Sequence, residues 1–161
     1  MKRTLMEATF TFFVVSLLWV PVMLAQEEPR GPRAVEVRVE TGTKEGALQF
    51  APNRLRFERG VYYKLIIHNP SPLSHYFTSD AFSTHIFTRK VESLDSQGNT
   101  IAEIHGDVRD IELAPGATVA WYFYPMIKGE KLKLYCHKEG HEEQGMVGEI
   151  EIYGPPPFSG Q

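Results

Sequence analysis

Apolar and polar residues alternate in many short runs between residues 35 and 153. In the first run, Val35, Val37 and Val39 alternate with charged neighbours. Because successive side chains of a strand point to opposite faces, this pattern predicts half-buried strands. We expect strands at residues 35–40, 55–57, 61–69, 91–94, 101–105, 108–113, 119–124, 132–136 and 148–153.

The alternation loosens in one place, between Thr78 and Lys90, where we expect a short helix or irregular insertion around residues 78–90. Elsewhere Gly and Pro separate the runs, as at Pro115-Gly116, and no long helical period occurs. Many short strands with such turns are typical of all-β domains. We therefore predict a Greek-key β-sandwich or barrel.

Residues 1–25 have the composition of a secretion signal peptide. Lys2 and Arg3 precede a charge-free apolar run over residues 8–20, and Ala25 offers a small residue for cleavage. The alternative is an uncleaved anchor over residues 8–26, because about 20 apolar residues span a bilayer. We then expect a linker at 26–34, one domain at 35–154 and a Pro-rich tail at 155–161.

The chain has 161 residues, a net charge of −3 and one cysteine, Cys136. This mild acidity gives no reason to expect nucleic acid as a partner. An exported cysteine usually forms a disulfide, and Cys136 has no partner in its own chain. It is therefore a free thiol, half of an intermolecular disulfide or a metal ligand.

The residues after Cys136 favour a metal ligand. His141 and Met146 follow at intervals of five residues. Thiolate, imidazole and thioether are three of the four ligands of a mononuclear blue-copper site, whose second histidine must come from elsewhere. Strand parity agrees, because Cys136 shares the inward face of Leu132 and Leu134, and Met146 shares that of Ile150 and Ile152.

Most of the chain from residue 35 onward resembles the cupredoxins, the small copper proteins of the plastocyanin, azurin and auracyanin type. The motifs are Phe50-x-Pro52-x-x-Leu55-x-Phe57-x-x-Gly60, Leu113-Ala114-Pro115-Gly116 and Cys136-x4-His141-x3-Gly145-Met146-x-Gly148. In that family the first histidine ligand follows a strand that ends in an Asn-rich loop, and His75 follows Asn69 here. The resemblance implies a cupredoxin-like fold and one copper ion held by His75, Cys136, His141 and Met146.

This chain departs from the family beside two of these residues. Many cupredoxins carry Asn after the first His and Thr or Ser after the Cys, and those residues link the two ligand loops. Here Tyr76 and His137 stand in those places, and Glu139 replaces the usual Pro. Groups around the ligands tune a metal site, so the resemblance does not determine the colour or the reduction potential of this one.

Each candidate has an alternative interpretation. Cys136 could be an inert buried thiol, and His75 a surface loop residue. Met146 could pack in the core, with Gln144 as the fallback oxygen ligand. His137 could conduct an electron through the Cys–His peptide or be an exposed polar residue.

Other residues near the motifs are also ambiguous. The aromatics Tyr76, Phe77, Phe82 and Phe87 could form an apolar docking patch or close one end of the sandwich. The other three histidines in the folded region, His68, His85 and His105, are interpreted as structural or surface residues. The acidic pair Glu142-Glu143 could dock a basic partner or be a solvated loop.

The resemblance implies an exported type 1-like copper protein that transfers electrons by cycling between Cu(I) and Cu(II). The alternative is a copper chaperone, store or sensor, and a metal-free or zinc-filled interaction domain is a third possibility. No catalytic motif is evident, so we expect a non-enzyme. We expect a protein redox or copper-transfer partner, a periplasmic or other extracytoplasmic location, and membrane attachment only if residues 8–26 are retained.

Overall fold

The computed structural model describes residues 32–157, so the predicted signal segment at 1–25 lies outside the described residues. The elements in chain order are β1 (Val35–Thr41), β2 (Phe50–Ala51), β3 (Arg54–Glu58), β4 (Tyr63–His68), β5 (His75–Thr78), α1 (Asp80–His85), β6 (Ile86–Leu94), β7 (Thr100–Ile104), β8 (Asp110–Leu113), β9 (Thr118–Pro125), β10 (Gly129–Tyr135) and β11 (Val147–Tyr153). The prediction of an all-β fold is confirmed.

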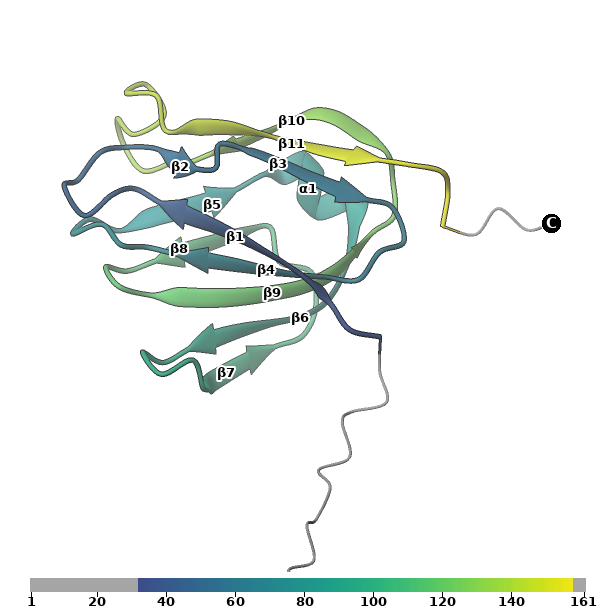
Figure 1. Ribbon diagram of the computed structural model, residues 1–161. Helices are drawn as coiled ribbons and strands as arrows, with labels where there is room; N and C mark the ends of the chain where they lie inside the picture. Colours follow the sequence, from purple (N-terminus) through teal and green to yellow (C-terminus); the bar gives the residue numbers. More distant parts are fainter. Residues whose placement is uncertain (1–31, 158–161) are drawn as a thin grey trace, which may run out of the picture. The chain divides into compact units, whose positions relative to one another are not determined.

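The strands form two sheets that face each other across the core (Figure 1). One sheet has the order β2-β1-β4-β9-β6-β7 and the other β3-β11-β10-β5-β8. The pairs β1–β4 and β3–β11 are parallel, whereas the other pairs are antiparallel. Both parallel pairs join strands that are distant in the sequence, so the sandwich depends on long-range contacts.

Aromatic side chains fill the space between the sheets. The largest fully buried ones are Trp121, Phe57, Phe77, Phe82 and Phe123. Each such ring removes a large apolar area from water, and most pack edge to face. Trp121 Nε1 donates a hydrogen bond to Thr88 Oγ1 at 3.1 Å, which satisfies the one polar atom of the indole.

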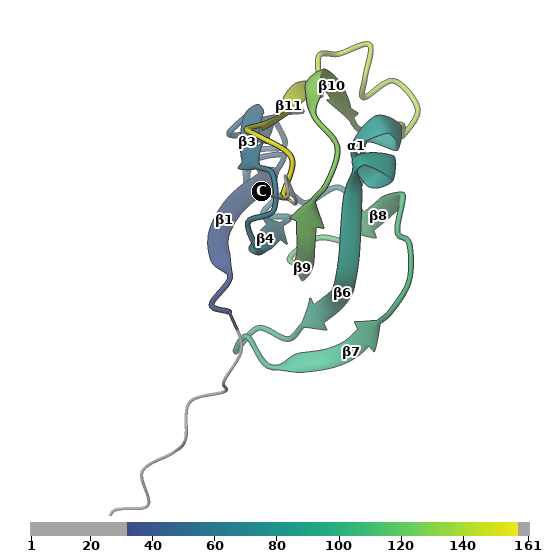
Figure 2. The same ribbon diagram turned by 90° about the vertical axis from the view of Figure 1, so that its right-hand side faces the viewer.

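The region around residues 78–90 contains the expected short helix and also more strand than expected. Helix α1 lies beside β10 and β6 (Figure 2). Strand β6 begins at Ile86 rather than at residue 91, and its pairing with β9 shifts register between Thr88 and Lys90. Such a bulge breaks the period-two pattern, which explains why the sequence concealed this part of the strand. The strand predicted at residues 108–113 is shorter in the structure, because β8 begins at Asp110.

Within residues 32–157, no helix is long and apolar enough to span a membrane.

Candidate metal centre

Three buried side chains converge at one end of the sandwich. His75 begins β5, Cys136 follows β10, and His141 lies in the β10–β11 loop. The two histidine Nδ1 atoms are 3.2 Å apart, and Cys136 Sγ lies 3.4 Å from His141 Nδ1. These candidate ligand atoms all lie within 4.8 Å of one another. Among the described residues this is the only such group of three His, Cys, Asp or Glu side chains.

Cys136 reaches the cluster by the alternation of β10. Leu132 and Leu134 are buried, and Cys136 continues on the same face with no exposed surface. The loop that follows is closed by backbone hydrogen bonds: Met146 N–H donates to His141 O at 3.0 Å, and Cys136 N–H donates to Met146 O at 3.2 Å. These backbone hydrogen bonds thus hold Cys136, His141 and Met146 close together.

Glycines permit the tight path of this loop. Gly140 and Gly145 have φ values of 77° and 97°, which lie in the left-handed region where a Cβ is costly. Gly145 N–H donates to Glu142 O at 2.9 Å, and Gln144 N–H donates to Gly140 O at 3.2 Å. Gly145, which belongs to the family motif, and Gly140 therefore both shape the turn.

Met146 and Gln144 differ sharply as candidates for the fourth ligand. Met146 is fully buried, and its backbone bonds to both Cys136 and His141. Gln144 is exposed, and its side-chain amide donates to Gly140 O at 2.8 Å. The structure thus disfavours Gln144 as the fourth ligand, while ligation by Met146 remains a proposal.

His75 is the first residue of β5, paired with Leu113 of β8, and it is fully buried, so the alternative interpretation as a surface loop residue is wrong. The Pro- and Ser-rich segment before it concealed the start of the strand. That segment is held by the buried side chain of Asn69, whose amide nitrogen donates to the carbonyls of Leu73, Leu113 and Ala114 at 2.8–3.1 Å. Its carbonyl accepts from Ser71 N–H at 3.0 Å. Asn69 therefore joins the His75 segment to the β8–β9 turn.

Gly42, just after β1, lies behind the His75 ring. A Cβ at Gly42 would lie 2.6 Å from His75 Nε2 and 2.8 Å from Ser71 Cβ, and the Gly42 φ is 79°. His75 Nε2 is buried and has no hydrogen-bond partner among the described residues. The absence of a side chain at Gly42 thus gives the imidazole its place. Nothing in the sequence pattern pointed to this contact.

The electrostatics keep the cluster ready for a cation. Burial lowers the pKa of His75 to about 4, and the nearby His141 and Lys138 push it in the same direction. Burial, followed by Lys138, also lowers the pKa of His141. Both rings are therefore neutral at pH 7. On the sulfur side, Tyr76 N–H donates a hydrogen bond to Cys136 Sγ at 3.2 Å.

The donor set fits a soft or borderline metal ion. A hydrogen bond between the two facing Nδ1 atoms would need a proton on one of them, whereas a metal ion would use the lone pairs of both. One thiolate with two imidazoles suits copper and also zinc. The cluster could hold one such ion.

The remaining predicted residues lie outside the cluster. His137 is partly exposed, with its Nδ1 at 3.0 Å from Thr78 Oγ1. His68 pairs with Thr118, His105 pairs with Glu103, and His85 ends α1. Of the acidic pair, Glu142 forms an ion pair with Lys133, and Glu143 is exposed.

The four aromatics around His75 divide between the two interpretations. Phe77 and Phe82 are fully buried and help to fill the sandwich, as the closing interpretation expected. Phe87 is 54% exposed and lines a separate apolar hollow with Tyr124 and Met126. Tyr76 is half-buried and packs against His137.

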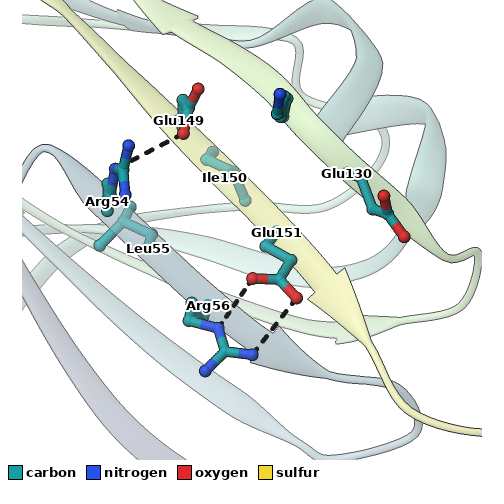
Figure 3. Close-up of a pocket in the computed structure, with 8 residues that line it drawn as sticks. Arg54, Leu55, Arg56, Glu130, Glu149, Ile150 and Glu151 are labelled. Atoms are coloured by element: carbon teal, nitrogen blue, oxygen red, sulfur yellow. Dashed lines mark hydrogen bonds and ion pairs between the residues drawn. The ribbon is translucent and has the colours of Figure 1, made fainter.

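A larger hollow of about 580 Å³ lies on β3, β10 and β11, and no cluster residue lines it. Figure 3 shows its ion pairs, Arg54 with Glu149 and Arg56 with Glu151. Because these charges neutralise each other across two parallel strands, we interpret this face as a solvated sheet surface.

No protein-family model and no curated protein sequence matches the chain. Solved structures do match. A multicopper oxidase from Pediococcus acidilactici has a TM-score of 0.57 and 18% identity over 88% of this chain and 31% of its own. A copper-containing nitrite reductase from Thermus scotoductus SA-01 has a TM-score of 0.55 and 16% identity over 80% of this chain and 32% of its own.

An auracyanin from Roseiflexus castenholzii matches over 76% of this chain and its own full length, with 14% identity and a TM-score of 0.49. The chain spans about a third of the length of the two copper enzymes. At these identities the matches describe architecture rather than activity. Together with the two-sheet topology, the two copper-enzyme matches confirm the predicted architecture: the chain has the cupredoxin fold, and its His75–Cys136–His141 cluster fits a type 1 copper site.

Proposed function

We propose that the chain is an exported copper protein that carries single electrons. The observation that carries this proposal is the convergence of one thiol and two neutral imidazoles within 4.8 Å in a buried site. His75, Cys136 and His141 would hold the ion, with Met146 as the weak fourth ligand. Bound copper would supply a one-electron couple between Cu(I) and Cu(II).

The protein's own contribution is to keep its donors still. The Asn69 hydrogen bonds hold the segment before His75, and the closed loop after Cys136 holds His141. A frame that barely moves between oxidation states would favour fast transfer, because little reorganisation is needed. Tyr76 N–H would stabilise the thiolate charge of Cys136.

Burial supports a carrier over a copper chaperone, store or sensor. His75 and Cys136 have no exposed surface, and His141 is 7% exposed. A protein that hands over its ion needs a site that an acceptor's ligands can enter. We further propose a non-enzymatic role with an unidentified protein redox partner, in a periplasmic or other extracytoplasmic compartment.

Copper loading tests the proposal directly. Purified protein titrated with Cu(II) should develop an intense thiolate-to-copper absorption and an EPR signal, and ascorbate should bleach both. Cys136→Ser should abolish the colour while circular dichroism still shows the β fold, and the matched control His105→Ala should keep the colour. An unchanged absorption in Cys136→Ser would exclude this cluster as the copper site.

The reduction potential tests the fourth ligand. Met146→Gln should retain copper but lower the reduction potential, since an oxygen donor favours Cu(II). An unchanged potential would leave Met146 as a packing residue only.

Reversible voltammetry with slow loss of Cu(I) to a chelator supports a carrier, whereas rapid loss of Cu(I) supports a chaperone or store. Binding of zinc alone supports the structural alternative.

A further inference from the structure

The residues that follow His75 and Cys136 contact each other outside the cluster. The rings of Tyr76 and His137 have centroids 3.9 Å apart and planes inclined by 32°. Tyr76 is half-buried, and the His137 side chain is 41% exposed. This aromatic pair therefore joins the segment that carries His75 to the segment that carries Cys136.

Backbone pairing between these segments is sparse. Strands β5 and β10 share one residue pair, Thr78 with Tyr135. By contrast, β5 pairs with β8 at four positions, and β10 pairs with β11 at five. The ladder between the two strands that deliver the cluster is thus the weakest part of its sheet. Side chains must supply the remaining attachment.

The surroundings of the aromatic pair fix both rings. Thr78 Oγ1 lies 3.0 Å from His137 Nδ1, and Asp110 Oδ2 lies 3.8 Å from His137 Nε2. The side chain of Glu112, the partner residue of Tyr76 across β5 and β8, raises the pKa of the Tyr76 hydroxyl. Side chains of β5 and β8 therefore lie against His137, which follows β10.

Tyr76 contacts both residues of the Cys136–His137 dipeptide. Its backbone N–H donates to Cys136 Sγ at 3.2 Å, and its ring packs on His137. Because Cys136 and His137 are adjacent in sequence, fixing the His137 ring restricts the backbone that carries the thiol. The ring contact would therefore maintain the geometry of the hydrogen bond from the amide to the sulfur.

We propose that Tyr76 and His137 are positioning residues that close the β5–β10 junction and hold the Cys136 sulfur in the cluster. In metal-free protein, the aromatic pair keeps Cys136 inaccessible. In copper-loaded protein, an effect that rests on the proposed function, it sets the donor strength of the sulfur. The first effect requires no metal.

Alkylation of the metal-free full chain by iodoacetamide, followed by mass spectrometry, measures the first effect. Cys136 is the only cysteine and is fully buried, so the rate at fixed pH reports opening of the junction. Since such ring pairs contribute about 1 kcal/mol, Cys136 of Tyr76→Ala should be alkylated roughly fivefold faster than in the native protein. His137→Ala should behave alike, and the double variant should exceed either single variant only slightly.

Matched variants separate positioning from general destabilisation. Tyr76→Phe keeps the ring and should alkylate at close to the native rate. Tyr124→Ala removes a tyrosine that stacks on Tyr62 at 4.7 Å elsewhere in the fold, and its alkylation should change little. The proposal is overturned if Tyr76→Ala and His137→Ala alkylate at the native rate, if their effects multiply independently, or if Tyr124→Ala accelerates alkylation equally.

The copper spectra distinguish this proposal from the proposed function. If the native protein binds copper with a thiolate absorption, Tyr76→Ala should shift that band and the EPR splitting, and Tyr76→Phe should restore both. Unchanged spectra would overturn the second effect. If native protein shows no copper absorption, the proposed function fails, and the alkylation rates still decide the positioning role.

Discussion

His75 is enclosed on two sides by contacts of different kinds. In front, its Nδ1 faces His141 Nδ1, and behind it only a glycine at position 42 leaves enough room for the ring. The orientation of the His75 ring is therefore set both by its contact with His141 and by the space that Gly42 leaves. Burial of this kind disfavours the protonated form, which lowers the pKa of His75 to about 4.

The low pKa of His75 predicts acid sensitivity of the metal-free protein. An unfolded histidine titrates near pH 6.5, so between about pH 6.5 and pH 4 the unfolded chain binds a proton that folded His75 does not. The contribution to the free energy of unfolding is intact above pH 6.5 and falls as pH decreases, by up to about 3 kcal/mol. Urea unfolding at several pH values measures it.

A comparison variant isolates the contribution of His75. In His75→Leu, the slope of the unfolding free energy between pH 6.5 and pH 4 should flatten. His141, whose pKa is also lowered, should leave a smaller residual slope. Identical slopes in the two proteins would contradict the assignment to His75.

At this scale the sequence predicted some contacts and missed others for physical reasons. Strand parity correctly put Cys136 on the inward face, because parity depends only on neighbours in the chain. The contact of Gly42 with His75 could not be predicted, since it joins the end of β1 to the start of β5 through the absence of a side chain. The packing of Tyr76 on His137 is likewise a product of the fold.

The loop between β4 and β5 leads to His75 and contains no helix or strand. Its anchor is Asn69, which satisfies three carbonyls and one N–H from the surrounding backbone. A buried polar group pays a full desolvation cost when its partner is lost. One side chain thus stabilises a whole connection.

Asn69→Ala should therefore lower the free energy of unfolding by about 2–4 kcal/mol, because it leaves several buried backbone groups unpaired. Chemical denaturation of the metal-free protein measures this change. Asn99→Ala is the control, since Asn99 makes its hydrogen bonds to Asp95 in an exposed turn. Equal losses in the two variants would show that Asn69 has no special structural role.

The strands that the sequence located best are those with unbroken alternation, such as β3 and β11. Two strands were obscured in the sequence pattern. β6 carries a bulge that interrupts its period, and β5 follows a Pro- and Ser-rich segment typical of loops. The family resemblance nevertheless identified His75, because it depends on order in the chain rather than on periodicity.

For the whole molecule, the predicted destination is outside the cytoplasm. Lys2, Arg3 and the apolar run to residue 20 lead us to expect a mature protein that begins at Gln26. Mass spectrometry of the protein from fractionated cells measures its N-terminus. A variant with Leu17→Asp and Leu18→Asp should remain in the cytoplasm at full length.

Other fractions would point elsewhere. An intact N-terminus in the membrane fraction of cells expressing the native sequence would support the anchor at residues 8–26. An intact native chain in the cytosol would refute export.

The parallel pairing of β3 with β11 has a consequence for the time at which the site can form. The Arg56–Glu151 ion pair joins residues 95 positions apart, and the loop that carries His141 lies just before β11. Long-range pairings of this kind are slow to form. While the ribosome is still making the chain, β3 lacks its neighbour and the end of the sandwich lacks its closing loop. The cluster can therefore assemble only after the chain has been synthesised through β11.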